Sequence, residues 1–188
     1  MVATLETPEK TDEQLAAEAA REGSDGPAFV TLMGRHRDRV WRVCYRLMGN
    51  EHDAGDAAQE VFVRMFLARA SFAGRSKYTT WVHGMAVRTC LSLRRSRGRR
   101  LRHETTVGEE AFARHEPQQK TTDPGLTPDL THMLETLDEE DRALLILKYA
   151  ESYSYEELAD IFDLSTSACK MRVSRAKEKL QSRYGTGD

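Results

Sequence analysis

A block of cationic residues without any carboxylate carries the strongest chemical signal in this sequence. Residues 61–103 contain 11 Lys or Arg and no Asp or Glu. Groups of this kind bind polyanions, because they contact phosphates directly and release condensed counterions. The block therefore predicts a polyanion partner, and the alternative is a solvated helix surface without a ligand. Six arginines are concentrated at its end: Arg94, Arg95, Arg97, Arg99, Arg100 and Arg102.

A second cationic segment follows a short turn at 163–165. The spacing predicts a helix over 166–183 that buries Cys169, Val173, Ala176 and Leu180 on one face. Two helices joined by three residues, the second of them basic, indicate a helix-turn-helix, and the alternative is a plain helical hairpin. Cationic side chains here would contact phosphates or guanines. The predicted DNA-facing residues are Ser165, Thr166, Ser167, Lys170, Met171, Arg172, Ser174 and Arg175.

Neither the histidines nor the cysteines show the spacing of a catalytic or metal site. The chain has six His and three Cys, with no CxxC pair, no nucleophile motif and no Gly-rich phosphate loop. We therefore expect no enzyme activity, no metal and no cofactor. Surface or structural roles are the better interpretation of the histidines.

Length and hydropathy exclude a membrane span and a secreted disulfide scaffold. No apolar run approaches the ~18 residues that a span needs, and the first residues lack an apolar signal core. The odd number of scattered cysteines argues against a disulfide framework. We expect a cytoplasmic protein, and 188 residues suffice for one medium or two small domains.

Hydrophobic periodicity predicts helices throughout and no sheet, so the expected fold class is all-α. A helix over 12–22 is followed by one that begins at Pro27 and ends at Gly49-Asn50. Further helices are expected from about 53 to 70 and from Thr79 or Thr80 to about 97. Residues 12–103 would form the first domain, after a disordered stretch over 1–11.

The second domain is expected over 132–183, with a tail over 184–188. Asp138 with Asp141 and Ser154 with Glu157 resemble helix capping boxes. Residues 104–131 contain three of the five prolines and little hydrophobic material, which indicates a flexible acidic linker. The stretch 104–163 has a net charge of -12. The linker is either a nucleic-acid mimic or a soluble tether.

Three aromatic residues lie beside cations in the first block: Phe72, Tyr78 and Trp81. Aromatics next to cations suit stacking on unpaired bases. For Trp81, core packing is the favoured interpretation. For Phe72 and Tyr78, core packing and contact with an unpaired base are equally favoured interpretations.

Two motifs resemble those of bacterial RNA polymerase sigma factors of the extracytoplasmic-function (ECF) group. The second conserved region of that group resembles residues 53–66, DAGDAAQEVFVRMF, and 71–95, SFAGRSKYTTWVHGMAVRTCLSLRR. The fourth region resembles residues 134–180, which include SYEELADIFDLSTSACKMRVSRAKEKL. The two motifs occur in the family's order.

The resemblance implies a role for each cluster. The helix that resembles the D-A-x-D-x-x-Q-E-V-F pattern would bind core RNA polymerase through Asp53, Asp56, Gln59, Glu60 and Phe62. The -10 promoter element would be bound, and its opening nucleated, by the loop and helix that follow. The helix over 166–180 would read the -35 element. The -10 residues implied are Phe72, Arg75, Lys77, Tyr78, Arg88, Arg94 and Arg95.

Two departures from the family pattern affect the promoter sequence that would be read. Many relatives have Asn at the position of Arg88, and many have Gly-Thr-Val before Lys170.

Gly84 lies inside an expected helix, where glycine costs about 1 kcal/mol of helix stability relative to Ala. The resemblance also implies an anti-sigma factor as partner. The rival hypothesis is a stand-alone helix-turn-helix regulator that binds duplex DNA and no polymerase.

Overall fold

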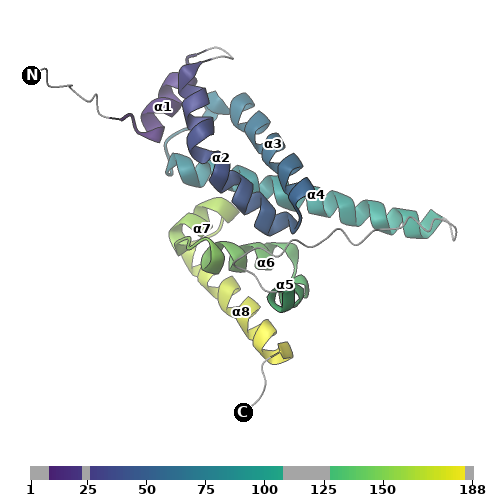
Figure 1. The fold of residues 1–188 in the computed structure, drawn as a ribbon. Coiled ribbons are helices and arrows are strands. Elements are labelled where there is room, and N and C mark those ends of the chain that lie inside the picture. Colours follow the sequence, from purple (N-terminus) through teal and green to yellow (C-terminus); the bar gives the residue numbers. More distant parts are fainter. Residues whose placement is uncertain (1–8, 23–25, 108–127, 185–188) are drawn as a thin grey trace, which may run out of the picture.

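The computed structural model describes residues 9–22, 26–107 and 128–184, and these form helices joined by short turns (Figure 1). No β-strand occurs in those ranges, so the all-α prediction is confirmed. The predictions for 1–8, 108–127 and 185–188 lie outside the described residues. The elements are α1 Asp12–Ala19, α2 Pro27–Met48, α3 Glu51–Leu67, η1 Arg69–Ser71, α4 Tyr78–Val107, α5 Pro128–Glu135, α6 Glu139–Leu145, η2 Ile146–Ala150, α7 Tyr155–Phe162 and α8 Thr166–Tyr184.

Local capping signals set the ends of the first helices. Thr11 and Gln14 form a capping box at the start of α1, and Pro27 occupies the first turn of α2. Gly49 ends α2 with a φ of 82°, a left-handed conformation that glycine adopts without strain. Asn50 then caps α3 through the backbone N–H of Asp53.

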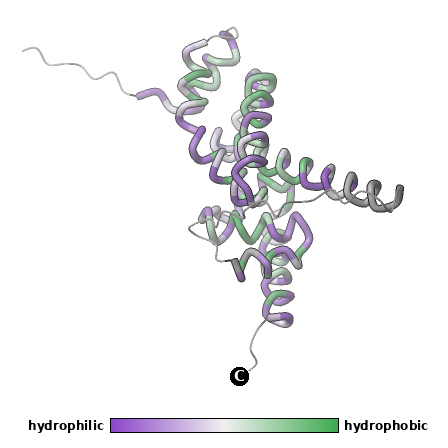
Figure 2. Tube along the Cα trace, turned by 45° about the vertical axis from the view of Figure 1, so that its right-hand side comes forward, coloured by the Kyte–Doolittle hydropathy of each residue, from purple (hydrophilic) through white to green (hydrophobic). Residues whose placement is uncertain are grey.

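Helices α1 to α4 form the first domain and pack around one hydrophobic core. Hydrophobic and hydrophilic residues alternate along these helices, as amphipathic helices require (Figure 2). Leu32, Val43, Val61 and Met65 are fully buried where α2 meets α3. Val82 and Ala86 bring α4 into the same core.

The fourth helix is longer than its apolar pattern predicts. It begins at Tyr78 and continues to Val107, ten residues beyond the expected end at Arg97. The sequence after Arg97 lacks an apolar stripe, but Arg is a good helix former, which favours continuation of the helix. The predicted linker start at 104 therefore falls inside α4, and α5 begins at Pro128 rather than at 132. The helix predicted over 53–70 is α3 followed by the short η1.

Helices α5 to α8 form the second domain, in which Asp138 and Ser154 cap helices as predicted, and Ser154 forms a complete capping box. The side chain of Asp138 accepts hydrogen bonds from the backbone N–H groups of Glu140 and Asp141 at the start of α6. Ser154 and Glu157 form the predicted capping box of α7. The apolar helix predicted after Asp138 continues from α6 into a π-helical turn, η2.

The two domains lie in direct contact in this structure, with α4 packed against α6 and α7 and α2 against η2 (Figure 1). Arg46 of α2 donates hydrogen bonds to the carbonyl of Ala150 and to the carboxylate of Glu151. The sequence predicts independent modules, because patterns within each helix do not report contacts between distant segments. The packing of one domain on the other corrects that expectation.

Candidate nucleic-acid interface

The outer face of α3 combines acidic and apolar side chains. Asp56 and Gln59 are exposed, and so are Val63 and Leu67, whose exposed fractions are 53% and 73%. Glu60 receives a hydrogen bond from Arg64 one turn later, at 2.7 Å. Exposed apolar residues on one helix face beside acidic ones suit contact with a protein rather than with phosphates.

Two residues predicted on that docking surface are directed toward the protein interior. Phe62 is half-buried against the core. Asp53 is 3% exposed, so the prediction that it forms part of a docking surface is corrected.

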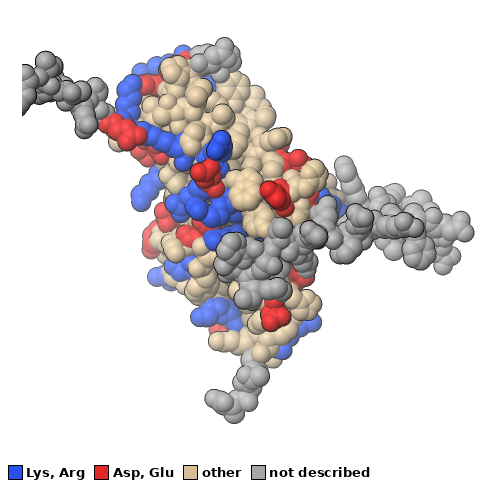
Figure 3. Space-filling model, viewed as in Figure 1, with Lys and Arg blue, Asp and Glu red and all other residues tan. Residues whose placement is uncertain are grey.

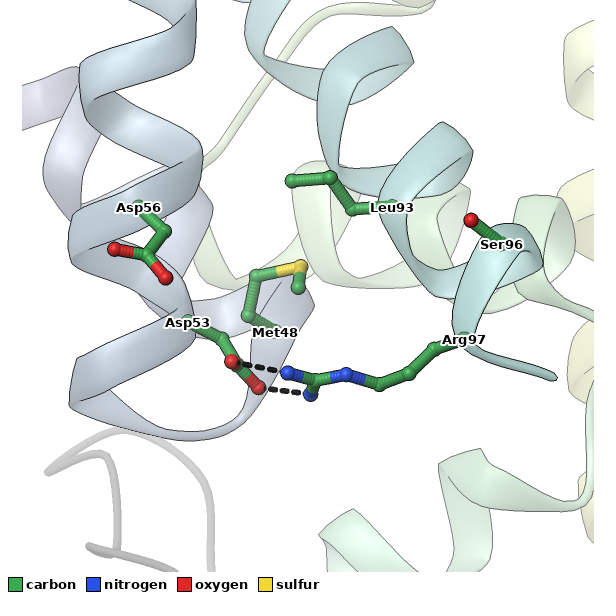
Figure 4. A pocket seen from close by; sticks show the side chains of 6 residues that line it. All are labelled: Met48, Asp53, Asp56, Leu93, Ser96 and Arg97. Atoms are coloured by element: carbon green, nitrogen blue, oxygen red, sulfur yellow. Dashed lines mark hydrogen bonds and ion pairs between the residues drawn. The ribbon is translucent and has the colours of Figure 1, made fainter. Parts of the chain in front are cut away.

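The carboxylate of Asp53 binds within its own domain, beside a shallow pocket between α3 and α4 (Figure 4). It accepts two hydrogen bonds from the guanidinium of Arg97 and one from the side-chain amide of Asn50, the latter at 2.6 Å. The Arg97 hydrogen bonds lower the pKa of Asp53 below its ordinary value. Asp53 therefore joins the first turn of α3 to α4.

The aromatic residues around the loop between α3 and α4 form one cluster. Ring centroids of Phe72, Tyr78 and Trp81 lie 5.1–5.5 Å apart. Tyr78 is 1% exposed, and burial raises the pKa of its hydroxyl. This corrects the prediction that Tyr78 contacts DNA, because its ring packs in the core. Phe72 and Trp81 are half-buried, whereas Arg75 and Lys77 are exposed.

Three arginines of α4 predicted to bind the -10 element project toward the second domain. Arg94 donates to a carboxylate oxygen of Glu139 at 2.7 Å, and Arg95 to one of Glu140 at 2.6 Å. Arg88 donates to the main-chain carbonyl of Ile161 at 3.2 Å. The structure therefore places these three arginines against carboxylates of α6 and a main-chain carbonyl of α7.

Gly84 has a structural explanation in this arrangement. A Cβ atom added at Gly84 would lie 3.1 Å from a guanidinium nitrogen of Arg88. The guanidinium of Arg88 therefore folds back over the helix at Gly84, where no side chain stands in its way. Partial burial there lowers the pKa of Arg88.

Helix α8 presents the predicted polar face to solvent. Cys169, Val173 and Ala176 are buried, which confirms that part of the apolar stripe, while Leu180 is half-buried. Ser165 caps the helix, accepting a hydrogen bond from the backbone N–H of Ala168. Thr166 is half-buried. The exposed residues of the predicted DNA-facing set are Ser165, Ser167, Lys170, Met171, Ser174 and Arg175.

Arg172 differs from the other cations of α8. Its guanidinium donates to Asp141 at 2.7 Å and to Glu140 at 3.0 Å, within the second domain. These hydrogen bonds join α8 to the start of α6 and lower the pKa of Glu140. The predicted contact of Arg172 with DNA therefore needs this guanidinium to release its carboxylates.

The described residues contain no cluster of His, Cys, Asp or Glu able to hold a metal ion. Cys44, Cys90 and Cys169 are free and buried. None of the helices in ranges 9–22, 26–107 and 128–184 combines the length and hydropathy needed to cross a membrane.

Comparison with known proteins agrees with this division into two helical units. A family model described as Sigma-70 region 2 matches residues 32–100, and one described as Sigma-70, region 4 matches 128–180. The ECF RNA polymerase sigma factor SigE of Mycolicibacterium smegmatis is 32% identical over 158 residues, which are 82% of this chain and 61% of that protein. The ECF factor SigW of Bacillus subtilis is 25% identical, covering 84% of this chain and 89% of that protein.

The chain belongs to the ECF group of the sigma-70 family. A solved complex of the sigma factor RpoE with the anti-sigma factor NepR from Bartonella quintana has a TM-score of 0.62 and 25% identity, covering 84% of this chain and 98% of that one. CnrH in complex with the cytosolic domain of CnrY shares the fold, with a TM-score of 0.65 and 24% identity over 92% and 96% of the two chains.

Some residues of this sigma factor's surface were not predicted from its sequence. Val63 and Leu67 were not singled out, although they lie four and eight residues after Gln59 on the same helix face. Their helical spacing from Gln59 could have identified them as part of the same surface. The carboxylates that bind Arg94 and Arg95 had no sequence signal, because they lie 45 residues farther along the chain.

Replacing Asp53 with Asn is expected to lower the free energy of unfolding by about 1–3 kcal/mol near pH 7, because Arg97 loses its charged acceptor. The Arg97 hydrogen bonds hold the folded-state pKa of Asp53 below 3.8. The stabilisation is therefore present above about pH 4 and is lost as the pH falls through the folded-state pKa.

Urea unfolding near neutral pH and near pH 3 measures the difference in the free energy of unfolding between wild type and D53N. This difference should be smaller at pH 3. The exposed Asp56→Asn variant of the same helix serves as the control and should change stability little. An equal loss for both variants would contradict the role given to Asp53.

Proposed function

We propose that this sigma factor binds core RNA polymerase, directs it to promoters through -10 and -35 elements, and nucleates promoter opening. The observation that carries the proposal is the exposed polar and cationic face of α8, on the same chain as the acidic and apolar face of α3. The α8 face is suited to bind in the major groove of DNA, and the α3 face is suited to bind a protein.

The polymerase-docking surface is proposed on the outer face of α3. Asp56, Gln59 and Glu60 supply polar contacts, while Val63 and Leu67 supply apolar area. Duplex phosphates would repel the two carboxylates, so this face favours a protein partner over DNA. Phe62 lies beneath this face, because its ring packs against the hydrophobic core.

The -10 surface is proposed on the loop before α4 and on α4 itself. Arg75 and Lys77 are exposed, and Phe72 lies beside them with part of its ring accessible. Opening about ten base pairs costs on the order of 14 kcal/mol, while capture of a flipped base supplies only a few kcal/mol. The chain therefore nucleates opening, and the polymerase holds the bubble.

The -35 surface is proposed on α8. Ser167 and Ser174 are small enough to let the helix approach the bases, while Lys170 and Arg175 reach phosphates or guanine edges. An anti-sigma factor is proposed as a further partner, because the solved relative RpoE is complexed with one, NepR.

Run-off transcription with core polymerase and a genomic DNA library tests the proposal against a stand-alone regulator. Wild-type chain should co-elute with core polymerase and yield transcripts from a restricted set of start sites. Tight binding to a duplex operator, without co-elution and without transcripts, would favour the rival function.

Replacing Val63 with Asp is expected to weaken co-elution with core polymerase at least tenfold, because it puts a charge into the apolar part of the docking face. Val30→Asp is the matched control, since Val30 of α2 is 56% exposed, close to the 53% of Val63. Transcription should fall for V63D and persist for V30D. Equal effects would show that the α3 face is not the docking surface.

Replacing Arg175 with Ala is expected to lower the slope of log affinity against log salt concentration by about 1, from an expected value near 5. Binding to a duplex recovered from the transcription experiment is measured at several salt concentrations. Arg37→Ala, an exposed arginine of α2, is the matched control and should keep the wild-type slope. An unchanged slope for R175A would remove Arg175 from the phosphate contacts.

A further inference from the structure

The first turn of α4 follows a residue that cannot cap it with its side chain. The backbone N–H of Trp81 donates to the carbonyl of Lys77, so Lys77 stands at the cap position of the helix. Its side chain has donors but no acceptor, so it cannot bind the N–H groups that a first turn leaves free. Thr79 and Thr80, where the sequence predicts the helix to begin, lie inside it. A side-chain cap therefore has to come from another segment.

Glu13 of α1 supplies an acceptor at this position. Its carboxylate accepts a hydrogen bond from the backbone N–H of Tyr78, the first residue of α4, at 3.2 Å. Tyr78 is 1% exposed, so water does not readily replace this acceptor, and a buried N–H without a partner is costly. A carboxylate at the N-terminus of a helix also interacts favourably with the helix dipole. Glu13 therefore caps α4 from 65 residues away in the sequence.

Helix α1 is itself fixed on the first domain by the residues beside Glu13. The carboxylate of Asp12 accepts a hydrogen bond from Arg35 at 2.8 Å and lies 2.8 Å from Nε2 of His36, both on α2. Leu15, one turn later, is buried in the hydrophobic core. Figure 3 shows Asp or Glu beside Lys or Arg over α1. These contacts restrain the backbone that carries Glu13.

The loop over 72–77 is held by α1 at both of its ends. Before the loop, η1 packs against α1, and after the loop, α4 begins at the residue that is bound to Glu13. The ring centroid of Tyr78 lies 5.1 Å from that of Phe72 and 5.4 Å from that of Trp81. The aromatic rings around the loop therefore pack on the residue that Glu13 holds.

We propose that Glu13 is a positioning residue for promoter opening, because its cap on α4 holds the loop over 72–77 in the arrangement that meets the -10 element. The inference rests on the proposed function of this loop as part of the -10 surface. Phosphates would repel the carboxylate, so Glu13 acts through the loop and not on DNA. Without the cap the first turn of α4 frays, and opening slows by the fraction of chains in which that turn is formed.

Hydrogen exchange in the free chain tests the cap without polymerase. Glu13→Ala removes the acceptor, so the backbone N–H groups of residues 78–81 should exchange about fivefold faster, the effect of losing one helix cap. Glu13→Gln keeps an amide oxygen as acceptor and should stay within about twofold of wild type. Glu18→Ala is the matched control, because it removes one carboxylate from the same helix, where Glu18 pairs with Lys10 at 2.8 Å. Its exchange over 78–81 should equal that of wild type.

Promoter opening by the complex with core polymerase tests the positioning role. Permanganate reactivity of unpaired thymines measures the rate of opening, and gel retardation of the closed promoter duplex measures the affinity of the binding step. Glu13→Ala should slow opening about fivefold and keep duplex affinity within about twofold of wild type, since α8 lies in the other domain. Glu13→Gln should restore most of the opening rate, and Glu18→Ala should keep the wild-type rate. A residue that only stabilised the fold would lower the opening rate and the duplex affinity together.

Wild-type exchange or wild-type opening in Glu13→Ala would overturn the inference, and so would an equal loss in Glu13→Gln or an equal loss of duplex affinity. Run-off transcription by the wild type separates this failure from that of the proposed function. Promoter-specific transcripts from the wild type, with opening unchanged in Glu13→Ala, contradict the positioning role alone. A wild type without such transcripts contradicts the proposed function and the positioning role with it, while exchange in the free chain still decides whether Glu13 caps α4.

Discussion

Hydrogen bonds and ion pairs from the arginines of α4 to the second domain hold the two halves of the molecule together. Arg88, Arg94 and Arg95 lie on one helix, within the block 61–103 that has no acidic residue. Glu139, Glu140 and Ile161 of the other domain accept from them at 2.6–3.2 Å, and Arg94 also donates to the main-chain carbonyl of Leu47 in its own domain at 3.0 Å. Segregation of charge along the sequence therefore lets the cationic helix of one domain pair with the acidic start of α6 in the other.

The packing of the first domain keeps two surfaces independent. The buried stripe of α3, which includes Val61 and Met65, directs Gln59 and Val63 outward, away from the domain contact. The core residues of α4, such as Val82 and Ala86, hold the arginine face toward α6 and α7. One surface is thus exposed, while the other contacts the second domain.

Features that depend on neighbouring residues could be predicted from the sequence, and those that depend on distant segments could not. Capping at Ser154, the end of α2 at Gly49 and the buried stripe of α8 follow from spacings of three or four residues. The acceptor of Arg88 lies 73 residues away, and no periodicity reports it. Tyr78 could not be assigned from its neighbours either. An aromatic residue beside cations in the sequence can pack in a hydrophobic core or stack on an unpaired base, and the sequence does not distinguish the two.

Energy transfer between dyes on the two domains tests the central claim most directly. Cys44, Cys90 and Cys169 are buried, so cysteines introduced at the exposed residues His52 and Lys179 would take the labels. The account predicts high transfer in the free chain and a large decrease in the Arg46→Gln variant, which loses the hydrogen bonds to Ala150 and Glu151. Transfer that is the same in the wild type and in that variant would contradict it.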